Sequence, residues 1–296
     1  MNDAGTAMPD IRGHLNAAAR SPYWRDTVGP QQQCPHLAAD TQCDLAIVGG
    51  GFTGLWTALE ARRRQPDTRI VLVEAGLCGN AASGRNGGFC APSISHGVVN
   101  ALKRWPAEAE KLVQFGRSNL DDFVADLAEF GMSVEFEREG KVTVAEKPWQ
   151  IEGLQAQAEI HRRFGVKSEV LSGDALRERF NSPLYAAGLY EPNYATLNPG
   201  KMVAELRRTA LSNAVQIHEN TPVTELRNDA GGIDLITHGG VIRAAQVVLA
   251  TNAAPPLLAR LRNKAIPIFD YAIVTRPLNA GELASIGWTG RHCIAD

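Results

Sequence analysis

One cluster of glycines constrains this chain more than any other feature of its sequence. Residues 49–54 (GGGFTG) have the G-x-G-x-x-G spacing, and they stand between an apolar run, 44–48 (DLAIV), and a helical pattern over 52–64. A short apolar run bounded by glycines predicts a buried parallel strand. A second such run, 69–74 (RIVLVE), follows the helix. The sequence therefore predicts a βαβ unit, the first unit of a Rossmann-like α/β domain.

The spacing of these glycines suits the diphosphate of a dinucleotide. Gly49 allows a tight turn, Gly51 lets the backbone approach the phosphates, and Gly54 lets the helix pack closely against the strand. The next amides, at Phe52 and Thr53, belong to a helix N-terminus, which carries a partial positive charge. The alternative interpretation is a glycine-rich turn in an α/β fold that binds no cofactor.

The second strand ends in Glu74, 20 residues after Gly54. A carboxylate at this position accepts hydrogen bonds from the hydroxyl groups of a ribose. It would repel a 2′-phosphate, so the sequence disfavours NADP and leaves NAD and FAD open.

Three features favour FAD over NAD. The loop 79–88 (GNAASGRNGG) offers donors beside a diphosphate and a ribityl chain, although an ordinary surface loop has the same composition. A long insertion with strands of its own interrupts the dinucleotide fold. A meander then leads to the strand 247–252 (VVLATN), which ends in a small polar turn.

Periodicity predicts the remaining elements. Helices are expected over 107–130, over 149–164 and from Pro199, which follows an Asn198 cap. Alternation predicts two paired strands, 134–137 and 142–144, joined by a turn at Gly140. An antiparallel meander and a later strand are expected at 215–219, 222–228, 233–238, 246–251 and 271–275.

Composition excludes several functional classes. The 30 basic and 32 acidic residues give a net charge of −2, and no basic run exceeds residues 62–64, so a nucleic-acid partner is not expected. No apolar stretch is long enough to span a membrane. The five cysteines form no CxxC pair, and the seven histidines form no HxxxH pair. This pattern indicates reduced thiols in a cytoplasmic protein and no metal site.

The order of the motifs resembles the D-amino-acid-oxidase type of FAD-dependent oxidoreductase, with the γ-glutamylputrescine oxidase-like and glycine oxidase-like members nearest. Four groups of segments carry the resemblance: 47–54 with 71–75, then 82–88 (ASGRNGG), then 197–210 with 219–226, and last 247–254 with 273–278. The composition of residues 1–43 predicts a loosely ordered arm, in which Tyr23–Trp24 is expected to pack onto the domain. The resemblance implies a discontinuous Rossmann-like FAD-binding domain (44–95 and 196–260) and an inserted antiparallel-sheet substrate domain (96–195 and 261–296).

The resemblance also implies which residues bind FAD. Asn252 stands where the family has glycine, a mild departure because asparagine tolerates the left-handed conformation. No catalytic residue is assigned. The implied FAD-binding residues are Gly49, Gly51, Phe52, Thr53, Gly54, Glu74, Ala75, Ser83, Arg85, Asn86, Gly87, Gly88, Val223, Ala250, Thr251 and Asn252.

The implied activity is oxidation of an amine or amino acid at a C–N bond, with hydride transfer to the flavin and oxygen or another acceptor taking the electrons. Family members continue well beyond the position of Asp296, so the chain is expected to lack the C-terminal third and its part of the substrate domain. A flavin dehydrogenase with a non-oxygen acceptor and an inactive or binding-only fragment are the alternatives. A plain NAD dehydrogenase is a further one.

Overall fold

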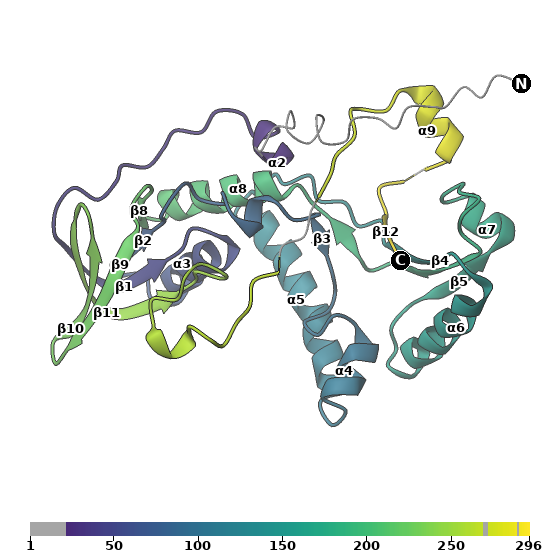
Figure 1. The fold of residues 1–296 in the computed structure, drawn as a ribbon, viewed down its shortest axis with the longest axis horizontal. Helices are drawn as coiled ribbons and strands as arrows, with labels where there is room; N and C mark the ends of the chain where they lie inside the picture. Colours follow the sequence, from purple (N-terminus) through teal and green to yellow (C-terminus); the bar gives the residue numbers. More distant parts are fainter. Residues whose placement is uncertain (1–21, 269–271, 289) are drawn as a thin grey trace, which may run out of the picture.

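The computed structural model describes residues 22–268, 272–288 and 290–296. Within them, six strands form one sheet in which four neighbouring strands are parallel and the last three along the chain form an antiparallel meander (Figure 1). The sheet order is β8 (Gln216–His218), β2 (Ile70–Val73), β1 (Thr41–Val48), β11 (Gly240–Leu249), β10 (Gly232–Thr237) and β9 (Val223–Asp229).

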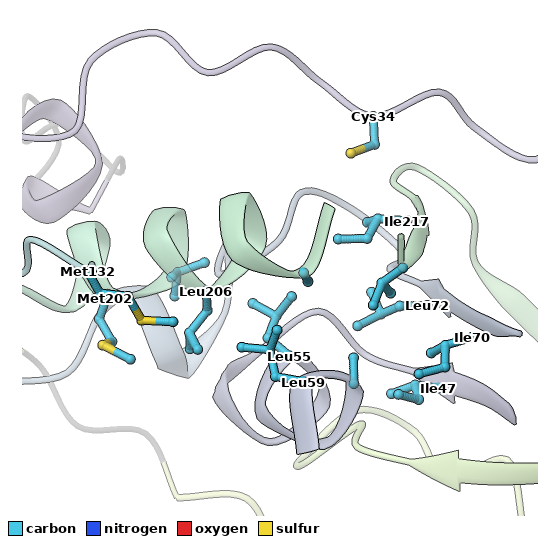
Figure 2. Close-up of a cluster of buried hydrophobic side chains, with 14 of the residues drawn as sticks. Cys34, Ile47, Leu55, Leu59, Ile70, Leu72, Met132, Met202, Leu206 and Ile217 are labelled. Carbon is cyan, nitrogen blue, oxygen red and sulfur yellow. The ribbon is translucent and has the colours of Figure 1, made fainter. Parts of the chain in front are cut away.

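Two helices cover one face of this sheet. α3 (Phe52–Arg64) follows β1, and α8 (Pro199–Ser212) begins at Asn198, whose side-chain oxygen accepts a hydrogen bond from the Lys201 N–H at 3.1 Å. Figure 2 shows Leu55 and Leu59 of α3 in a cluster with Leu206 of α8. The meander covers the opposite face of β1 and β2, which explains why β2 and the second half of β1, residues 45–48, are apolar throughout.

The inserted segment forms a second, smaller sheet. Its order is β12 (Cys293–Ala295), β4 (Lys141–Ala145), β6 (Ala187–Glu191) and β5 (Glu169–Ser172), and β12 alone among them runs parallel to its neighbour. α6 (Pro148–Arg163) and α7 (Gly173–Arg177) pack on it.

The remaining elements connect or flank the two sheets. The paired strands β3 and β7 lie between the sheets (Figure 1). The full set of connecting and flanking elements is α2 (Tyr23–Asp26), η1 (Ala82–Gly84), β3 (Phe89–Cys90), α4 (Val98–Arg104), α5 (Ala109–Glu129), β7 (Ala195–Thr196), η2 (Ala259–Leu261) and α9 (Ala280–Ile286).

The mixed α/β class is as predicted, and the four expected helices are α3, α5, α6 and α8, whereas α4, α7 and α9 were not predicted. The predicted pairing of residues 134–137 is wrong. Glu135 has a φ of 55°, which takes the backbone out of the extended region. The described chain there makes a bridge from Glu137 to Thr196 and no strand. β4 pairs with β6 and β12 instead.

The meander also differs from the expectation. Its predicted first strand, 215–219, contributes β8, which lies parallel to β2 at the edge of the sheet farthest from β9. β11 begins at Gly240, well before the expected residue 246. Residues 272–275 form no strand, and Tyr271 lies outside the described residues.

Candidate functional site

The predicted glycine motif lies at the C-terminal end of β1, where three backbone segments meet. Gly49 has a φ of 116°, and a Cβ there would lie 2.5 Å from the Ala250 carbonyl oxygen. A Cβ on Gly54 would lie 1.9 Å from the carbonyl oxygen of Gly49. Real Cβ atoms do not approach oxygen so closely, so both positions require glycine. The turn, the start of α3 and the end of β11 therefore form one tightly packed unit.

The N-terminus of α3 is joined to the loop that follows β2. The Phe52 N–H donates a hydrogen bond to Ser83 Oγ at 2.9 Å, and a Cβ on Gly51 would lie 2.8 Å from the same oxygen. Thr53 is exposed at the helix start. Amides in the first helical turn have no carbonyl four residues earlier within the helix, so those that Ser83 leaves free suit an anion.

Glu74 lies beside this turn, half-buried, with both carboxylate oxygens in contact with backbone amides. Oε2 accepts a hydrogen bond from the Gly50 N–H at 2.8 Å, and Oε1 accepts one from the Gly76 N–H at 2.9 Å. Each oxygen keeps a further lone pair for a ligand hydroxyl. The neighbouring Ala75 is exposed.

The loop 82–88 takes its shape from Asn86. Its side-chain amide donates to the carbonyl oxygens of Ala82 and Ser83, at 3.2 and 2.8 Å, and its Oδ1 accepts from the Gly88 N–H at 2.9 Å. Arg85 Nε donates to the carbonyl oxygen of Asn80, two residues before this loop, at 2.8 Å.

The glycines at the end of this loop have different surroundings. Gly87 is exposed, and a Cβ there would meet no atom within 4 Å, whereas one on Gly88 would lie 2.2 Å from the Leu197 carbonyl oxygen. Gly88 is therefore fixed by packing within the protein, and Gly87 leaves open space for a ligand.

The last group of predicted residues reaches the same edge from the meander. Ala250 follows β11, and its N–H donates to the Val48 carbonyl oxygen at 2.8 Å. Thr251 is half-buried, and Asn252 has a φ of 45°, in the left-handed region as its place in the family's glycine position implies. Val223 starts β9 two residues after Thr221, whose N–H donates to the Glu74 carbonyl oxygen at 2.9 Å.

This edge fits a dinucleotide by the chemistry of its groups. Glycines leave space at the turn, helix amides suit phosphates, and a carboxylate suits a ribose. The residues that meet there are Gly49, Gly51, Glu74, Ser83 and Ala250.

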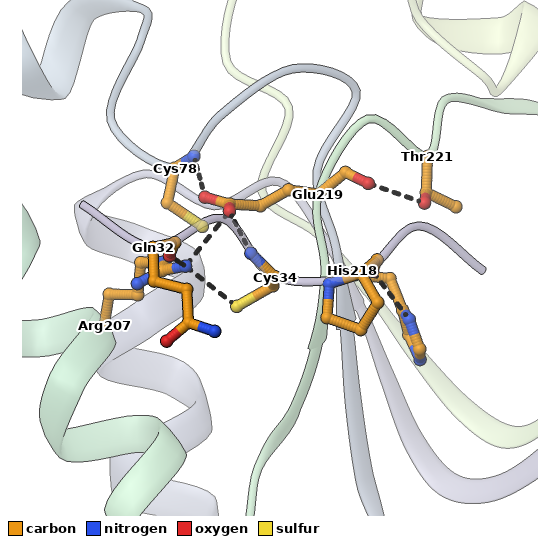
Figure 3. A network of polar contacts seen from close by, with 8 residues as sticks. Gln32, Cys34, Cys78, Arg207, His218, Glu219 and Thr221 are labelled. Atoms are coloured by element: carbon orange, nitrogen blue, oxygen red, sulfur yellow. Dashed lines mark hydrogen bonds and ion pairs between the residues drawn. The ribbon is translucent and has the colours of Figure 1, made fainter. Parts of the chain in front are cut away.

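A buried ion pair beside this edge has no signal in the sequence. Glu219 follows β8 and is 3% exposed. Its Oε1 accepts from the Cys78 N–H at 2.9 Å, and its Oε2 accepts from the Cys34 N–H at 2.7 Å and from Arg207 Nη2 at 3.1 Å (Figure 3). Burial alone would raise the pKa of Glu219, but these three donors outweigh it and hold the pKa below its usual value.

A cavity of about 480 Å³ opens next to the loop 82–88 and was not predicted either. Arg291 Nη1 and Glu137 Oε1 are 3.9 Å apart at this cavity, too far for a direct hydrogen bond. Glu135, also at the cavity, is engaged by Lys201, whose hydrogen bond lowers the pKa of that carboxyl group. The lining includes Trp24, Gly87, Phe89, Glu137, Trp288 and Arg291.

No helix in the described part of the chain is both long enough and apolar enough to cross a bilayer.

Comparison with known proteins places these features in a family context. The family model described as FAD dependent oxidoreductase matches residues 44–295. The chain is 25% identical over 272 residues to the probable oxidoreductase OrdL of Haemophilus influenzae, which covers 89% of this chain and 62% of that protein. It is 25% identical over 280 residues to the γ-glutamylputrescine oxidoreductase of Escherichia coli, with 93% and 65% covered.

A solved structure shares the fold. The glycine oxidase from Geobacillus kaustophilus superposes with a TM-score of 0.60 at 24% identity, over 72% of this chain and 56% of that one. The chain thus spans less than two thirds of the length of these three relatives.

Proposed function

Because the chain belongs to the family of FAD-dependent oxidoreductases, we propose that it binds FAD along the C-terminal edge of β1, β2 and β11 and oxidises an amine or an amino acid at a C–N bond. The observation that carries this proposal is the meeting of the glycine turn, Glu74 and Ser83 at one edge. The N-terminus of α3 would bind the diphosphate, and Glu74 would bind the adenosine ribose.

The other predicted residues would extend the site in both directions. Ser83 and Asn86 would shape the loop beside the diphosphate and the flavin edge, with Arg85, Gly87 and Gly88. Val223 would offer its backbone groups to the adenine. The turn at Ala250, Thr251 and Asn252 would close the site beside Gly49.

The cavity beside Gly87 and Phe89 is the place where we expect the substrate to bind. When bound, FAD supplies the hydride acceptor for the carbon that bears the amine. The Glu137 carboxylate would attract an ammonium group, and Arg291 would attract a carboxylate. The aromatic side chains of Phe89 and Trp288 would hold the carbon chain and keep water away.

Three curated relatives indicate which substrates and acceptors to test. One bears the name γ-glutamylputrescine oxidoreductase and another glycine oxidase, which supports an amine or an amino acid. A third is called L-2-hydroxyglutarate dehydrogenase, so an acceptor other than oxygen stands as the alternative.

The visible absorption spectrum of the purified chain tests the proposal, recorded before and after acid precipitation. A flavin spectrum that passes into the supernatant is the expected result, and it identifies a non-covalent flavin. A colourless chain that takes up no added FAD rejects the proposal. If NADH then protects this chain against unfolding, the NAD dehydrogenase alternative replaces it.

A second measurement identifies the substrate and the acceptor. Amines and amino acids are mixed with the flavin-loaded chain without oxygen, and the loss of flavin absorbance is followed. Bleaching with oxygen consumption on aeration indicates an oxidase, and bleaching without it indicates a dehydrogenase. A chain that holds FAD but is bleached by no amine or amino acid supports the binding-only alternative.

A further inference from the structure

The segment that precedes the first strand is held to the protein by polar contacts at several points. We call residues 22–37 the strap. It contains the single turn of α2 and then runs outside α8 toward the far end of the six-stranded sheet before it enters β1 (Figure 1). Its three prolines and three glutamines predict a loosely ordered arm, in which Tyr23–Trp24 alone is expected to pack onto the domain. The structure instead joins it to the residues around the candidate FAD site.

The first attachment is to the loop 82–88. Trp24 Nε1 donates a hydrogen bond to the carbonyl oxygen of Asn86 at 2.8 Å. A Cβ on Gly200, at the start of α8, would lie 2.4 Å from the Trp24 carbonyl oxygen, so this contact is close. Asn198 Nδ2 also donates to Thr27 Oγ1 at 2.8 Å. The strap is thus attached to Asn86, the residue that shapes the loop.

The second attachment is at Cys78, near the start of the longer segment 77–88 that contains this loop. The Glu219 carboxylate accepts from the Cys34 N–H of the strap and from the Cys78 N–H of the loop (Figure 3). Arg207 Nη2 donates to the same carboxylate and to the Gln32 carbonyl oxygen, at 3.1 and 2.6 Å. A single buried carboxylate therefore joins the strap to the loop.

Between these attachments the strap is not tightly packed. A cavity of about 270 Å³ lies beneath it, lined by Gln31 and Gln33 of the strap, Gly79 and Asn80 of the loop and Val203 of α8. Polar contacts near both ends, together with the buried side chains of Cys34 and Leu37, hold the strap in place.

From these contacts we infer that the strap fixes the conformation of residues 77–88 for FAD binding, with Trp24, Arg207 and Glu219 as positioning residues. The inference rests on the proposed binding of FAD. By thermodynamic linkage, a strap that stabilises the binding conformation must itself be stabilised by FAD to the same degree. Lifting the strap would release Asn86 from Trp24 and would remove Cys34 from Glu219, the residue that binds Cys78. The bond between Ser83 and α3 would remain.

Two substitutions test the inference without removing a predicted FAD-binding residue. Trp24→Phe keeps an aromatic ring but removes the Nε1 donor. Glu219→Gln keeps the size of the side chain, but it replaces one of the two oxygens that accept separately from Cys34 and Cys78 with an NH2 group, which cannot accept. Trp149→Phe, an exposed tryptophan on α6, is the matched control.

Hydrogen–deuterium exchange in the chain without FAD is the first readout. We expect faster exchange over residues 77–88 in Trp24→Phe and Glu219→Gln, with β1 and β2 unchanged and the control like the wild type. FAD titration is the second readout, with an expected increase in Kd of about two- to tenfold, which is the effect of losing one hydrogen bond. In the wild type, FAD is expected to slow exchange in the strap.

The outcomes separate this inference from the proposed function. If residues 77–88 exchange at the wild-type rate in both variants, the inference is overturned, even where FAD binds well. A wild-type chain that binds no FAD refutes the proposed function, and the exchange of residues 77–88 alone then decides whether the strap orders the loop. If Glu219→Gln fails to fold, Trp24→Phe still gives the decisive comparison.

Discussion

The hydroxyl oxygen of Ser83 accepts a hydrogen bond from the backbone N–H of Phe52, a residue 31 positions earlier in the chain, at 2.9 Å. This bond joins the loop after β2 to the N-terminus of α3. Because a Cβ on Gly51 would lie 2.8 Å from the same oxygen, the bond also requires glycine at that position. One hydroxyl group thus connects two segments that we propose bind the same diphosphate.

Replacing this serine should weaken both the loop and FAD binding. Ser83→Ala leaves the Phe52 N–H without its partner, which costs about 1 kcal/mol in the free energy of unfolding. We expect Kd for FAD to rise by about tenfold, measured by quenching of flavin fluorescence. Ser118→Ala, whose hydroxyl group bonds within an exposed stretch of α5, is the control and should bind FAD like the wild type. An unchanged Kd in Ser83→Ala would place the diphosphate elsewhere.

The elements predicted most closely are those whose partners are near in sequence. The helix expected over 52–64 is α3, Phe52–Arg64, because its periodicity and its glycine start lie within one short segment. The strand predicted at 134–137 is wrong for the opposite reason. Val134 is 2% exposed and lies in the core beside α8, so its alternation with polar neighbours reflects tertiary packing rather than a strand.

The candidate site shows the same division. The glycine turn and Glu74 lie in one βαβ unit, so their spacing could be read directly. The contact between Cys34 and Glu219 joins residues 185 positions apart, and no local pattern indicates it. The sequence order of β8 and β9 predicts that β8 belongs to the meander, whereas β8 pairs with β2. Sequence proximity does not predict strand pairing where the chain crosses from one edge of the sheet to the other between two strands, as it does between β8 and β9.

Gly54 should tolerate no side chain. A Cβ there would lie 1.9 Å from the carbonyl oxygen of Gly49, so Gly54→Ala must displace α3 from β1. We expect a loss of about 1–3 kcal/mol in the free energy of unfolding, the usual cost of overpacking, together with weaker FAD binding.

The matched control for this substitution is Gly153→Ala in α6, where a Cβ would meet no atom within 4 Å. An alanine there should stabilise the helix by about 0.5–1 kcal/mol. Urea denaturation of the two variants gives both values. Equal stability of Gly54→Ala and wild type would contradict the close packing of α3 on β1.

His161 should make the chain less stable in mild acid. The side chain is 2% exposed, and burial lowers its pKa below the usual 6.5, with Glu191 opposing and Lys141 adding to the shift. The unfolded chain therefore binds a proton more readily than the folded chain. The contribution to stability is fully present above pH 6.5 and is lost as the pH falls through 6.5 toward the pKa of the folded state.

The expected slope between pH 6.5 and 5 is up to about 1.4 kcal/mol per pH unit from this residue. Urea denaturation at several pH values measures it. His161→Gln, which cannot take up a proton, should flatten the curve, while burial of His292 leaves a smaller slope of the same sign. If the variant and the wild type have parallel curves, His161 does not titrate differently in the two states.

Asn252 holds a left-handed conformation beside the glycine turn, with a φ of 45°. Glycine adopts this region freely, and a β-branched side chain is strained there. Asn252→Gly should therefore change the free energy of unfolding by only about a few tenths of a kcal/mol, whereas Asn252→Val should cost about 1–2 kcal/mol.

Thr251→Val is the control, because it places the same side chain at a neighbouring residue whose φ is outside the left-handed region. Since Ala250 contacts Gly49, the strained variant should also bind FAD more weakly than Asn252→Gly. Equal stability of the glycine and valine variants would show that the turn adopts another conformation.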